Sequence, residues 1–326
     1  MTLILTRRDV AALLDIDACI AAVREAFRLD ADGRTMPARV LGVHAAEGGF
    51  HFKAAGLVRG RTWFAGKLNA NFPANPARFG LPTIQGVIAL CDGGNGALLA
   101  LMDSIEITAL RTAAATAVAA EHLARPDSRV VTICGCGSQG RSQLRALRAV
   151  RSIERVWAFD SDAERSQRFA REMAEPALDV RGAASLGEAA RASDICVTCT
   201  PSHRPILGPA DVSPGTFVAA VGADSDDKQE LAPALMAAGT VVVDVLDQCA
   251  AIGDLHHALD AGAMTREDVY AELGELVAGR KPGRRSADEI TIFDSTGTAL
   301  EDVAAAVLVY EKAVGAGRGI AIALGE

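Results

Sequence analysis

The sequence predicts an α/β protein with two domains, one built on a doubly wound parallel sheet and the other a discontinuous α+β domain. Two observations predict this fold class. From Arg129 onward, short runs rich in valine, isoleucine and cysteine alternate with helical stretches, which is typical of parallel strands covered on both faces. A glycine-rich turn also follows the first run, where a strand of such a sheet passes into a helix. The length of 326 residues favours two domains, because one domain typically holds roughly 100–200 residues.

The elements of the parallel sheet are predicted one by one from the apolar runs. The runs lie at residues 130–134, 155–159, 194–200, 217–221, 240–244 and 289–293, and helical stretches at 138–149 and 162–174 follow the first two. Parallel neighbours need a crossover connection, and helices of this length supply it.

The first third of the chain has a different pattern. A capped helix is predicted after Asp17, and residues 39–52 alternate in a manner typical of a β-strand. Residues 298–316 carry apolar side chains at helical spacing, so that this last helix can leave the sheet domain and pack on the first. We therefore expect one domain of residues 1–112 plus 299–326, and a second of residues 113–298.

Composition excludes several classes of protein. Half of the residues are hydrophobic and 23% are charged, as in ordinary globular enzymes rather than disordered chains. A formal net charge of −8 provides no broad positive field, so neither nucleic acid nor an anionic membrane is expected as a partner. No apolar run reaches the roughly 18 residues of a membrane span, and no leader pattern is recognised at the N-terminus. These features predict a cytoplasmic protein.

The seven cysteines are spread through the chain in an odd number, which predicts reduced thiols rather than a disulfide framework. Cys196 and Cys199 form a C-x-x-C within a β-branched run, so they are interpreted as buried strand cysteines. A zinc site would need a second ligand pair at suitable spacing, and we expect no metal.

A dinucleotide site is predicted at G-C-G-S-Q-G, where Gly135, Gly137 and Gly140 lie between a strand and a helix. They permit a tight turn, close approach of a pyrophosphate, and close packing of helix on strand. Asp160 ends the next strand, 20 residues after Gly140, where a carboxylate binds the ribose hydroxyls and repels a 2′-phosphate. This favours NAD over NADP, although Arg165 nearby could soften the preference. The alternatives are a purely structural turn and a site for S-adenosylmethionine in a methyltransferase.

The chain resembles the ornithine cyclodeaminase and mu-crystallin family over nearly its whole length. The motifs are A-G-K-L-N-A-N-F-P-A-N-P, G-L-P-T-I-Q-G and M-D-S-I-E-I-T-A-L-R-T-A-A-A, followed by the glycine loop, T-C-T-P-S, G-A-D and F-D-S-T-G. The resemblance implies a Rossmann domain, an N-terminal domain for substrate binding and dimerisation, and a homodimer. It also implies activities that include ornithine and lysine cyclodeaminase, alanine dehydrogenase and ketimine reductase.

The resemblance implies roles for five charged residues. Arg39 and Arg111 match carboxylate-binding arginines, and guanidinium groups suit the carboxylate of an α-amino acid. Lys67 matches a lysine beside the substrate, where desolvation would lower its pKa toward proton transfer. Asp224 matches an aspartate that binds a side-chain ammonium or moves a proton. Lys53 stands about where ornithine cyclodeaminases carry a carboxylate, which favours the dehydrogenase and imine reductase branch.

Each of these residues has a plainer interpretation. Arg39 can be a surface arginine, Lys67 an exposed strand lysine and Lys53 a lysine at a strand edge. His51, which shares the predicted face of Lys53, is most simply a structural histidine. An unpaired buried arginine is costly, so a purely structural role suits Arg111 least.

The remaining site residues are expected around the cofactor because of their position: Thr112 directly follows Arg111, and the others lie at the ends of strands or in the glycine loop. They are Thr112, Gly135, Gly137, Ser138, Gln139, Gly140, Asp160, Thr200, Pro201, Ser202, Val221, Gly222, Ser295 and Gly297.

These observations favour an NAD(H)-dependent oxidoreductase acting at the Cα–N bond of a small L-amino acid or cyclic imine. The second interpretation is a cyclodeaminase that recycles its NAD while converting ornithine to proline and ammonia. The third is a mu-crystallin-like protein that binds the cofactor with little turnover. Lys67 and Asp224 argue against the third, because a binding protein needs no proton relay.

Overall fold

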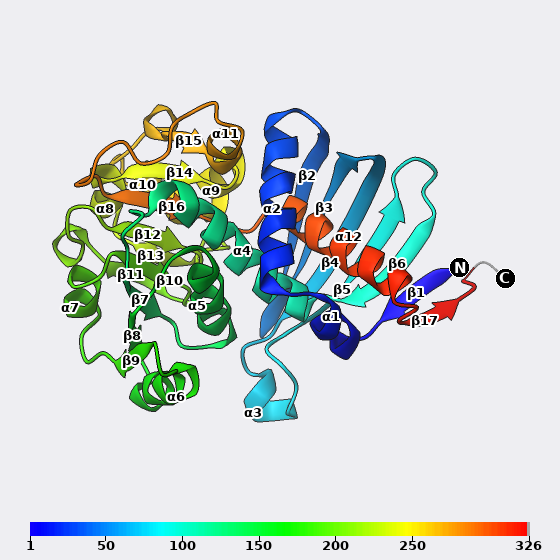
Figure 1. The fold of residues 1–326 in the computed structure, drawn as a ribbon, viewed down its shortest axis with the longest axis horizontal. Coiled ribbons are helices and arrows are strands. Elements are labelled where there is room, and N and C mark those ends of the chain that lie inside the picture. The colour runs from blue at the N-terminus through cyan, green and yellow to red at the C-terminus, as the bar shows by residue number, and fades with distance from the viewer. Residues whose placement is uncertain (325–326) are drawn as a thin grey trace. The chain divides into compact units, whose positions relative to one another are not determined.

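The computed structural model describes residues 1–324 (Figure 1). The chain divides into two compact units, one formed by Met1–Arg111 with the segment that begins at Thr298, and the other by Thr112–Gly297. It passes from the first unit to the second within α4 (Ile105–Leu123), and returns after Gly297.

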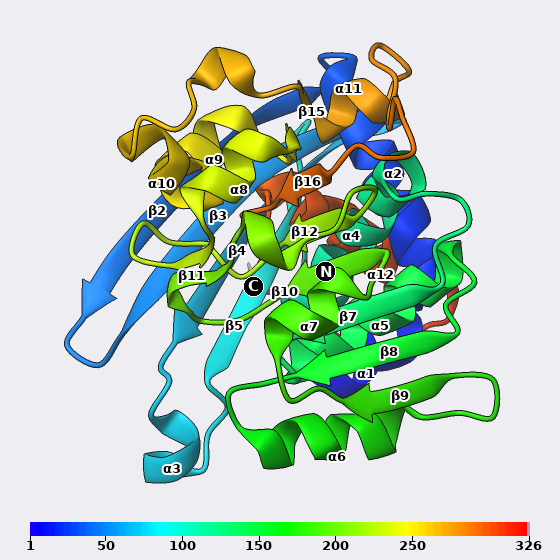
Figure 2. The ribbon, with the colours of Figure 1, turned by 90° about the vertical axis from the view of Figure 1, so that its left-hand side faces the viewer.

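The second unit is built on an eight-stranded, entirely parallel sheet in the order β15-β14-β16-β12-β10-β7-β8-β9 (Figure 2). The strands are β7 (Val130–Cys134), β8 (Arg155–Phe159), β9 (Asp179–Gly182), β10 (Ile195–Thr198), β12 (Phe217–Ala220), β14 (Thr240–Val243), β15 (Ala271–Glu272) and β16 (Thr291–Asp294). From β7 the order runs through β8 and β9 in one direction and through β10 and β12 in the other. This reversal places a topological switch point between β7 and β10, where such sheets bind ligands.

Helices and short segments connect these strands. They are α5 (Ser138–Val150), α6 (Ala163–Met173), α7 (Leu186–Arg191), α8 (Pro233–Ala238), α9 (Leu246–Ile252), α10 (Asp254–Asp260), α11 (Leu273–Val277), and the 3-10 turns Pro209–Asp211 and Arg266–Asp268. A separate pair, β11 (His203–Leu207) and β13 (Gln229–Leu231), forms a small parallel sheet. The residues of β10 and β12 are all buried, because helices cover both faces of a doubly wound sheet.

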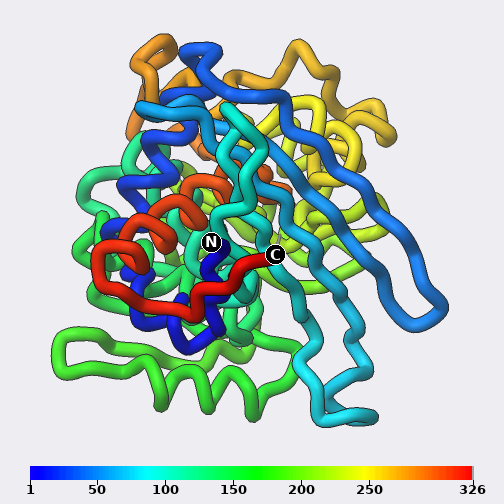
Figure 3. Tube along the Cα trace, turned by 90° about the vertical axis from the view of Figure 1, so that its right-hand side faces the viewer, coloured from blue at the N-terminus to red at the C-terminus, as the bar shows by residue number. Residues whose placement is uncertain are grey.

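The first unit contains a mixed seven-stranded sheet in the order β17-β1-β6-β5-β4-β3-β2. The strands are β1 (Thr2–Leu5), β2 (Thr35–Ala45), β3 (Gly48–Arg59), β4 (Arg61–Asn71), β5 (Ile84–Asp92), β6 (Leu98–Asp103) and β17 (Ile320–Ile322), and the helices are α1 (Arg7–Leu13), α2 (Ile16–Ala31), α3 (Asn75–Phe79) and α12 (Ala299–Gly315). Strands β1 and β17, the first and last of the described residues, pair antiparallel at one edge of this sheet (Figure 3).

The two faces of the long strands β2–β5 have opposite environments. On one face α12 packs on β3 and β4, and α2 packs on α12. On the other face a cross-strand row of Leu41, Phe52, Leu68 and Val87 is exposed, at 60%, 41%, 45% and 49%. An apolar row of this kind is typical of an interaction surface.

The predicted fold class is confirmed, and several local details differ from expectation. The first long helix is capped by Asp15, whose side chain accepts from the backbone N–H of Ala18, rather than starting after Asp17. Residues 39–52 do not form one strand, because the chain turns at residues 46–47 between β2 and β3. Strands β9 and β15 were not predicted, because neither coincides with a clear apolar run in the sequence. Within residues 1–324, no helix has the length and apolar character needed to cross a membrane.

Candidate active site

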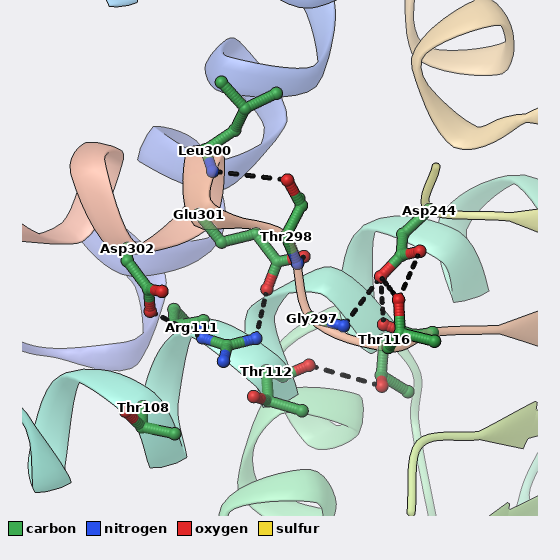
Figure 4. Close-up of polar contacts among 12 residues, drawn as sticks. Thr108, Arg111, Thr112, Thr116, Asp244, Gly297, Thr298, Leu300, Glu301 and Asp302 are labelled. Carbon is green, nitrogen blue, oxygen red and sulfur yellow. Dashed lines mark hydrogen bonds and ion pairs between the residues drawn. The ribbon is translucent and has the colours of Figure 1, made fainter. Parts of the chain in front are cut away.

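Four charged side chains of the first unit form a buried ionic cluster, of which Figure 4 shows Arg111, Glu301 and Asp302. Lys67 of β4 donates to Oδ1 of Asp302 at 2.8 Å and lies 2.7 Å from its Oδ2. Arg111 of α4 donates through Nε to Asp302 at 2.9 Å and through Nη1 to Glu301 at 2.9 Å. All four residues are at most 4% exposed. The burial of Lys67 and Arg111 therefore depends on the carboxylates of Glu301 and Asp302, which lie on α12.

The local structure explains how these side chains converge. In the antiparallel register Lys53 of β3 lies directly opposite Lys67, which lies opposite Ile88 of β5, so their side chains share the face that α12 covers. At the start of α12, Thr298 forms a capping box with Glu301. One carboxylate oxygen of Glu301 accepts from the backbone of Thr298 at 3.3 Å, which leaves the other for Arg111. The cap thus fixes the orientation of the carboxylate.

The cluster perturbs the titration of Lys67. The pKa of Lys67 is lowered to about 7, mainly by burial and also by the charges of Arg111 and Lys53, while Asp302 opposes the shift. The positive charges of Arg111 and Lys67 hold the pKa of Asp302 below its usual value, despite burial. At neutral pH the lysine can therefore exchange a proton while Asp302 stays ionised, which suits a general acid and base.

In the second unit the glycine loop has the shape of a dinucleotide cradle. Gly135 has φ +104°, and a Cβ there would lie 2.7 Å from the carbonyl oxygen of Cys199. A Cβ on Gly140 would lie 2.2 Å from the carbonyl oxygen of Gly135, whereas a Cβ on Gly137 would meet nothing within 4 Å. Gly135 and Gly140 are therefore required by the protein's own packing. Gly137 leaves open space beside the loop.

The start of α5 offers unused donors to a ligand. Gly137 precedes the helix without a side-chain cap, so the first N–H groups of α5 remain available to an anion. The side-chain Nε2 of Gln139 is buried and has no hydrogen-bond partner among residues 1–324. Ser138 is exposed at the same turn. These features fit a pyrophosphate, whose oxygens would accept from this loop.

Asp160 follows β8 and is held in place by backbone donors. Its two carboxylate oxygens accept from the N–H groups of Cys136, at 2.9 Å, and Asp162, at 3.0 Å. Arg165 approaches only to 3.9 Å. The carboxylate is thus fixed beside the glycine loop and keeps acceptor sites for ribose hydroxyls.

The other expected cofactor residues lie on three loops at the carboxyl ends of parallel strands. Thr200, Pro201 and Ser202 follow β10, Val221 and Gly222 follow β12, and Ser295 and Gly297 follow β16. Buried Asp244, at the end of β14, accepts from the side chain of Ser295 at 3.1 Å and from the backbone of Gly297 at 2.8 Å. This carboxylate orders the loop after β16, and sequence reasoning had recognised it only as the end of a strand.

Three further predicted residues lie outside the buried ionic cluster. Arg39 is exposed on the edge strand β2 and pairs with Ala54, so it shares the face of Ala54 rather than that of Lys53. Asp224, in the loop after β12, is half exposed, and Lys228 donates to it at 2.5 Å. Thr112 is buried on α4, in the second unit, and its carbonyl oxygen accepts from Thr116 at 3.4 Å.

Sequence reasoning missed Glu301 and Asp302, although a signal was present. Thr298 and Glu301 have the spacing of a capping box, and two adjacent acids stand in the first turn of an otherwise apolar helix. Because acids are common in a first helical turn, this pattern alone predicts a solvated helix end. Only the packing of α12 on β3 and β4 shows that both carboxylates face inward.

Comparisons with known proteins identify the family of this chain. A model of the ornithine cyclodeaminase/mu-crystallin family matches residues 1–317. The chain belongs to this family. Alanine dehydrogenase from Archaeoglobus fulgidus is 40% identical over 318 residues, which cover 96% of this chain and 95% of that protein.

Solved structures agree with the family assignment. An archaeal alanine dehydrogenase, a dimer with bound NAD, has a TM-score of 0.94 at 38% identity and covers 99% of both chains. Delta(1)-pyrroline-2-carboxylate reductase from Thermococcus litoralis, in complex with NADH and L-proline, has a TM-score of 0.94 at 33% identity and covers 98% of this chain and 100% of that one. The predicted membership of the ornithine cyclodeaminase/mu-crystallin family is confirmed, and the protein is an enzyme.

The first prediction concerns the pairing of Lys67 with Asp302. In Asp302→Asn the carboxylate that raises the pKa of Lys67 is lost, so this pKa falls further below 7. If Lys67 transfers the proton, the corresponding limb of the pH profile of kcat/KM shifts to lower pH by roughly one unit or more. Glu301→Gln is the matched control, since it removes an equally buried carboxylate that contacts Arg111 but not Lys67. It should raise KM and leave the limb in place. Equal shifts in both variants would contradict the role given to Asp302.

The second prediction concerns Asp160. Asp160→Ser removes the ribose acceptor and the repulsion of a 2′-phosphate, so the ratio of kcat/KM with NADPH to that with NADH should rise roughly tenfold. Asp162→Ser is the control, because Asp162 is acidic, caps α6 and lies in the same turn. An unchanged cofactor ratio in Asp160→Ser, or the same change in Asp162→Ser, would remove Asp160 from the cofactor site.

Proposed function

We propose that this enzyme is an NAD(H)-dependent oxidoreductase that acts at the Cα–N bond of a small L-amino acid or its imine. The observation that carries the proposal is the buried pair of Lys67 and Arg111, in which a lysine with a pKa of about 7 lies beside a fixed guanidinium. Reaction at a C–N bond needs a proton donor and acceptor at nitrogen, and a cation that orients the α-carboxylate.

In this proposal each charged group has one task. Arg111, whose planar group is fixed by Glu301 and Asp302, holds the substrate carboxylate, and Lys53 adds a second positive charge on the same face. Lys67 takes a proton from the substrate nitrogen during oxidation and returns one during imine reduction. A bound NAD would supply the hydride chemistry at Cα, in either direction. The cluster is almost completely buried, so its charges act on one another with little screening by water.

The cofactor assignment agrees with the residues of the second unit. The open space at Gly137, the uncapped start of α5 and the unpartnered Gln139 amide fit a pyrophosphate, and Asp160 fits an unphosphorylated ribose. Relatives with bound NAD or NADH support NAD(H) rather than S-adenosylmethionine as the ligand.

The cyclodeaminase alternative depends on a carboxylate for the side-chain ammonium of ornithine. Asp224 is the residue expected to supply it, but its carboxylate already accepts from Lys228 at 2.5 Å. Lys53 also places a cation on the face of the site, where a second ammonium at short range would be repelled. Both observations favour the dehydrogenase or imine reductase activity.

The third prediction separates these activities by the final position of the hydride. A small L-amino acid such as alanine should give reduced nicotinamide in a one-to-one ratio with 2-oxo acid and ammonia, because the hydride stays on the cofactor. Ornithine should give little proline. Absorbance of NADH and chromatographic analysis of the products measure both. Formation of proline and ammonia from ornithine with catalytic NAD, without net reduction of NAD by any amino acid tested, would favour the cyclodeaminase. Binding of the cofactor without turnover would favour a mu-crystallin-like protein.

We further propose that the enzyme is a homodimer in the cytoplasm. The exposed apolar row of Leu41, Phe52, Leu68 and Val87 suits a second copy of the same sheet, and an alanine dehydrogenase relative is a dimer. Each of the seven cysteines is a free thiol, which supports a reducing compartment.

The fourth prediction tests the homodimer. The double variant Leu41→Asp/Leu68→Asp places charges on the apolar row and should convert the dimer to a monomer of about 33.8 kDa, as measured by light scattering after size exclusion. Val314→Asp is the control, because Val314 is a similarly exposed apolar residue on α12. A native monomer, or a dimer that survives the double variant, would refute this interface.

A further inference from the structure

Glu230 is a completely buried carboxylate with an unusually full set of hydrogen bonds. It lies on the short strand β13, and its exposed fraction is zero. Its Oε1 accepts from the backbone N–H of Thr200 at 2.6 Å and from the hydroxyl of Thr200 at 2.7 Å. Its Oε2 accepts from the hydroxyl of Thr198 and the backbone N–H of Gly222, both at 2.8 Å. Four donors occupy the roughly four acceptor sites that an ionised carboxylate has.

The donors belong to two different loops. Thr198 ends β10 and Thr200 lies in the loop that carries Pro201 and Ser202, while Gly222 follows β12 in the loop that carries Asp224. The loops approach each other closely around the carboxylate. A Cβ on Gly222 would lie 2.3 Å from the carbonyl oxygen of Thr200 and 2.6 Å from Cδ of Glu230. Glu230 therefore links the two loops.

The strand order indicates which half of the dinucleotide these loops serve. The glycine loop and Asp160 follow β7 and β8, on one side of the switch point, and they match the adenosine half. Strands β10 and β12 lie on the other side, so the loops after them belong to the nicotinamide half of the crevice. The carboxylate of Glu230 thus supports one half of the cofactor site only.

We propose that Glu230 is a positioning residue that holds the loops after β10 and β12 in the geometry needed to bind the nicotinamide half of the dinucleotide. The inference rests on NAD(H) as the cofactor. Glu230 does not touch the cofactor itself; it acts through Thr200 and Gly222. Two of its four partners are backbone N–H groups, which can only donate. Only the ionised carboxylate can accept all four hydrogen bonds, so the glutamate performs this task as a carboxylate.

The groups around Glu230 make its charge sensitive to pH. Burial and then the charge of Asp254 on α10 raise the pKa of Glu230 to about 7, although the hydrogen bonds from Thr200 and Thr198 lower it. Asp254 accepts from the backbone of Glu230 at 2.8 Å, and behind it lies Asp294, whose pKa is also raised by burial. The charge of Lys228 also interacts with Glu230. The thiols of Cys134, Cys196 and Cys199 also face the carboxylate, and their raised pKa values keep them neutral.

The sign of the pH dependence follows from the raised pKa. Below about 7 Glu230 gains a proton and no longer accepts all four bonds, so the two loops lose part of their support. The affinity for NAD should therefore weaken as pH falls from 8 to 6, and binding near pH 7 should release a proton.

The fifth prediction compares the affinities for NAD and for AMP, which carries only the adenosine half. In Glu230→Gln the amide N–H₂ group lies against hydrogen-bond donors of the two loops and cannot accept from them. The Kd for NAD at pH 8 should therefore rise roughly tenfold or more, while the Kd for AMP stays within about twofold. Calorimetry or quenching of tryptophan fluorescence measures both affinities in the full chain. The dependence of NAD affinity on pH between 6 and 8 should also disappear in the variant.

Two further variants keep the test sharp. Thr198→Val removes one donor and keeps the glutamate, so it should weaken NAD binding in the same direction by a smaller factor. Glu289→Gln is the matched control: Glu289 is largely buried and hydrogen-bonded to Thr240 and Arg285, but precedes β16. It should leave the ratio of the two affinities unchanged.

The outcomes separate the possible failures. Equal weakening of NAD and AMP in Glu230→Gln would show a general structural role and overturn the inference, as would unchanged NAD binding. If the unmutated protein bound neither NAD nor AMP, the cofactor assignment would be refuted, and this inference with it.

Discussion

The first unit depends on the neutralisation of two buried cations by the first turn of α12. Lys67 and Arg111 come from the N-terminal part of the chain, but their partners Glu301 and Asp302 follow the whole second unit in sequence. Removing either carboxylate would leave an uncompensated charge in a nearly dry environment. The discontinuity of this unit thus has an electrostatic reason beside the apolar packing of α12, because the site is not complete until the chain returns.

The second unit uses buried carboxylates in a different way. Glu230 and Asp244 accept mainly from backbone N–H groups and hydroxyls of the loops at the carboxyl ends of β10, β12 and β16. Loops at this edge have no ladder of their own to satisfy their donors. A buried carboxylate beside these loops can accept hydrogen bonds from several donors at once, whereas a neutral side chain would accept fewer. The enzyme therefore orders these loops with charge while the faces of the sheet remain apolar.

The parts of the fold that could be predicted are those with a repeating physical cause. The runs at 130–134 and 155–159 coincide with β7 and β8, because continuous apolar strands and the glycine turn each leave a local pattern. The hairpin of β2 and β3 was missed because its turn at residues 46–47 lies inside one alternating stretch. Glu230, Glu301 and Asp302 were not recognised because an acid in the sequence is most simply a solvated residue, and only long-range packing buries it.

In the reaction proposed above, the charge around Lys67 connects substrate binding with proton transfer. Burial is the main cause that lowers the pKa of Lys67 and favours the neutral amine; the charges of Arg111 and Lys53 act in the same direction, and Asp302 opposes them. The α-carboxylate of a bound substrate adds a negative charge beside these cations and raises the pKa of Lys67 again. An imine would thus encounter a lysine that is protonated because the substrate has bound. In the proposed oxidation of an amino acid, the same carboxylate would strengthen the lysine as a base. One cluster can therefore serve both directions of the reaction, because the substrate supplies the charge that adjusts the proton carrier.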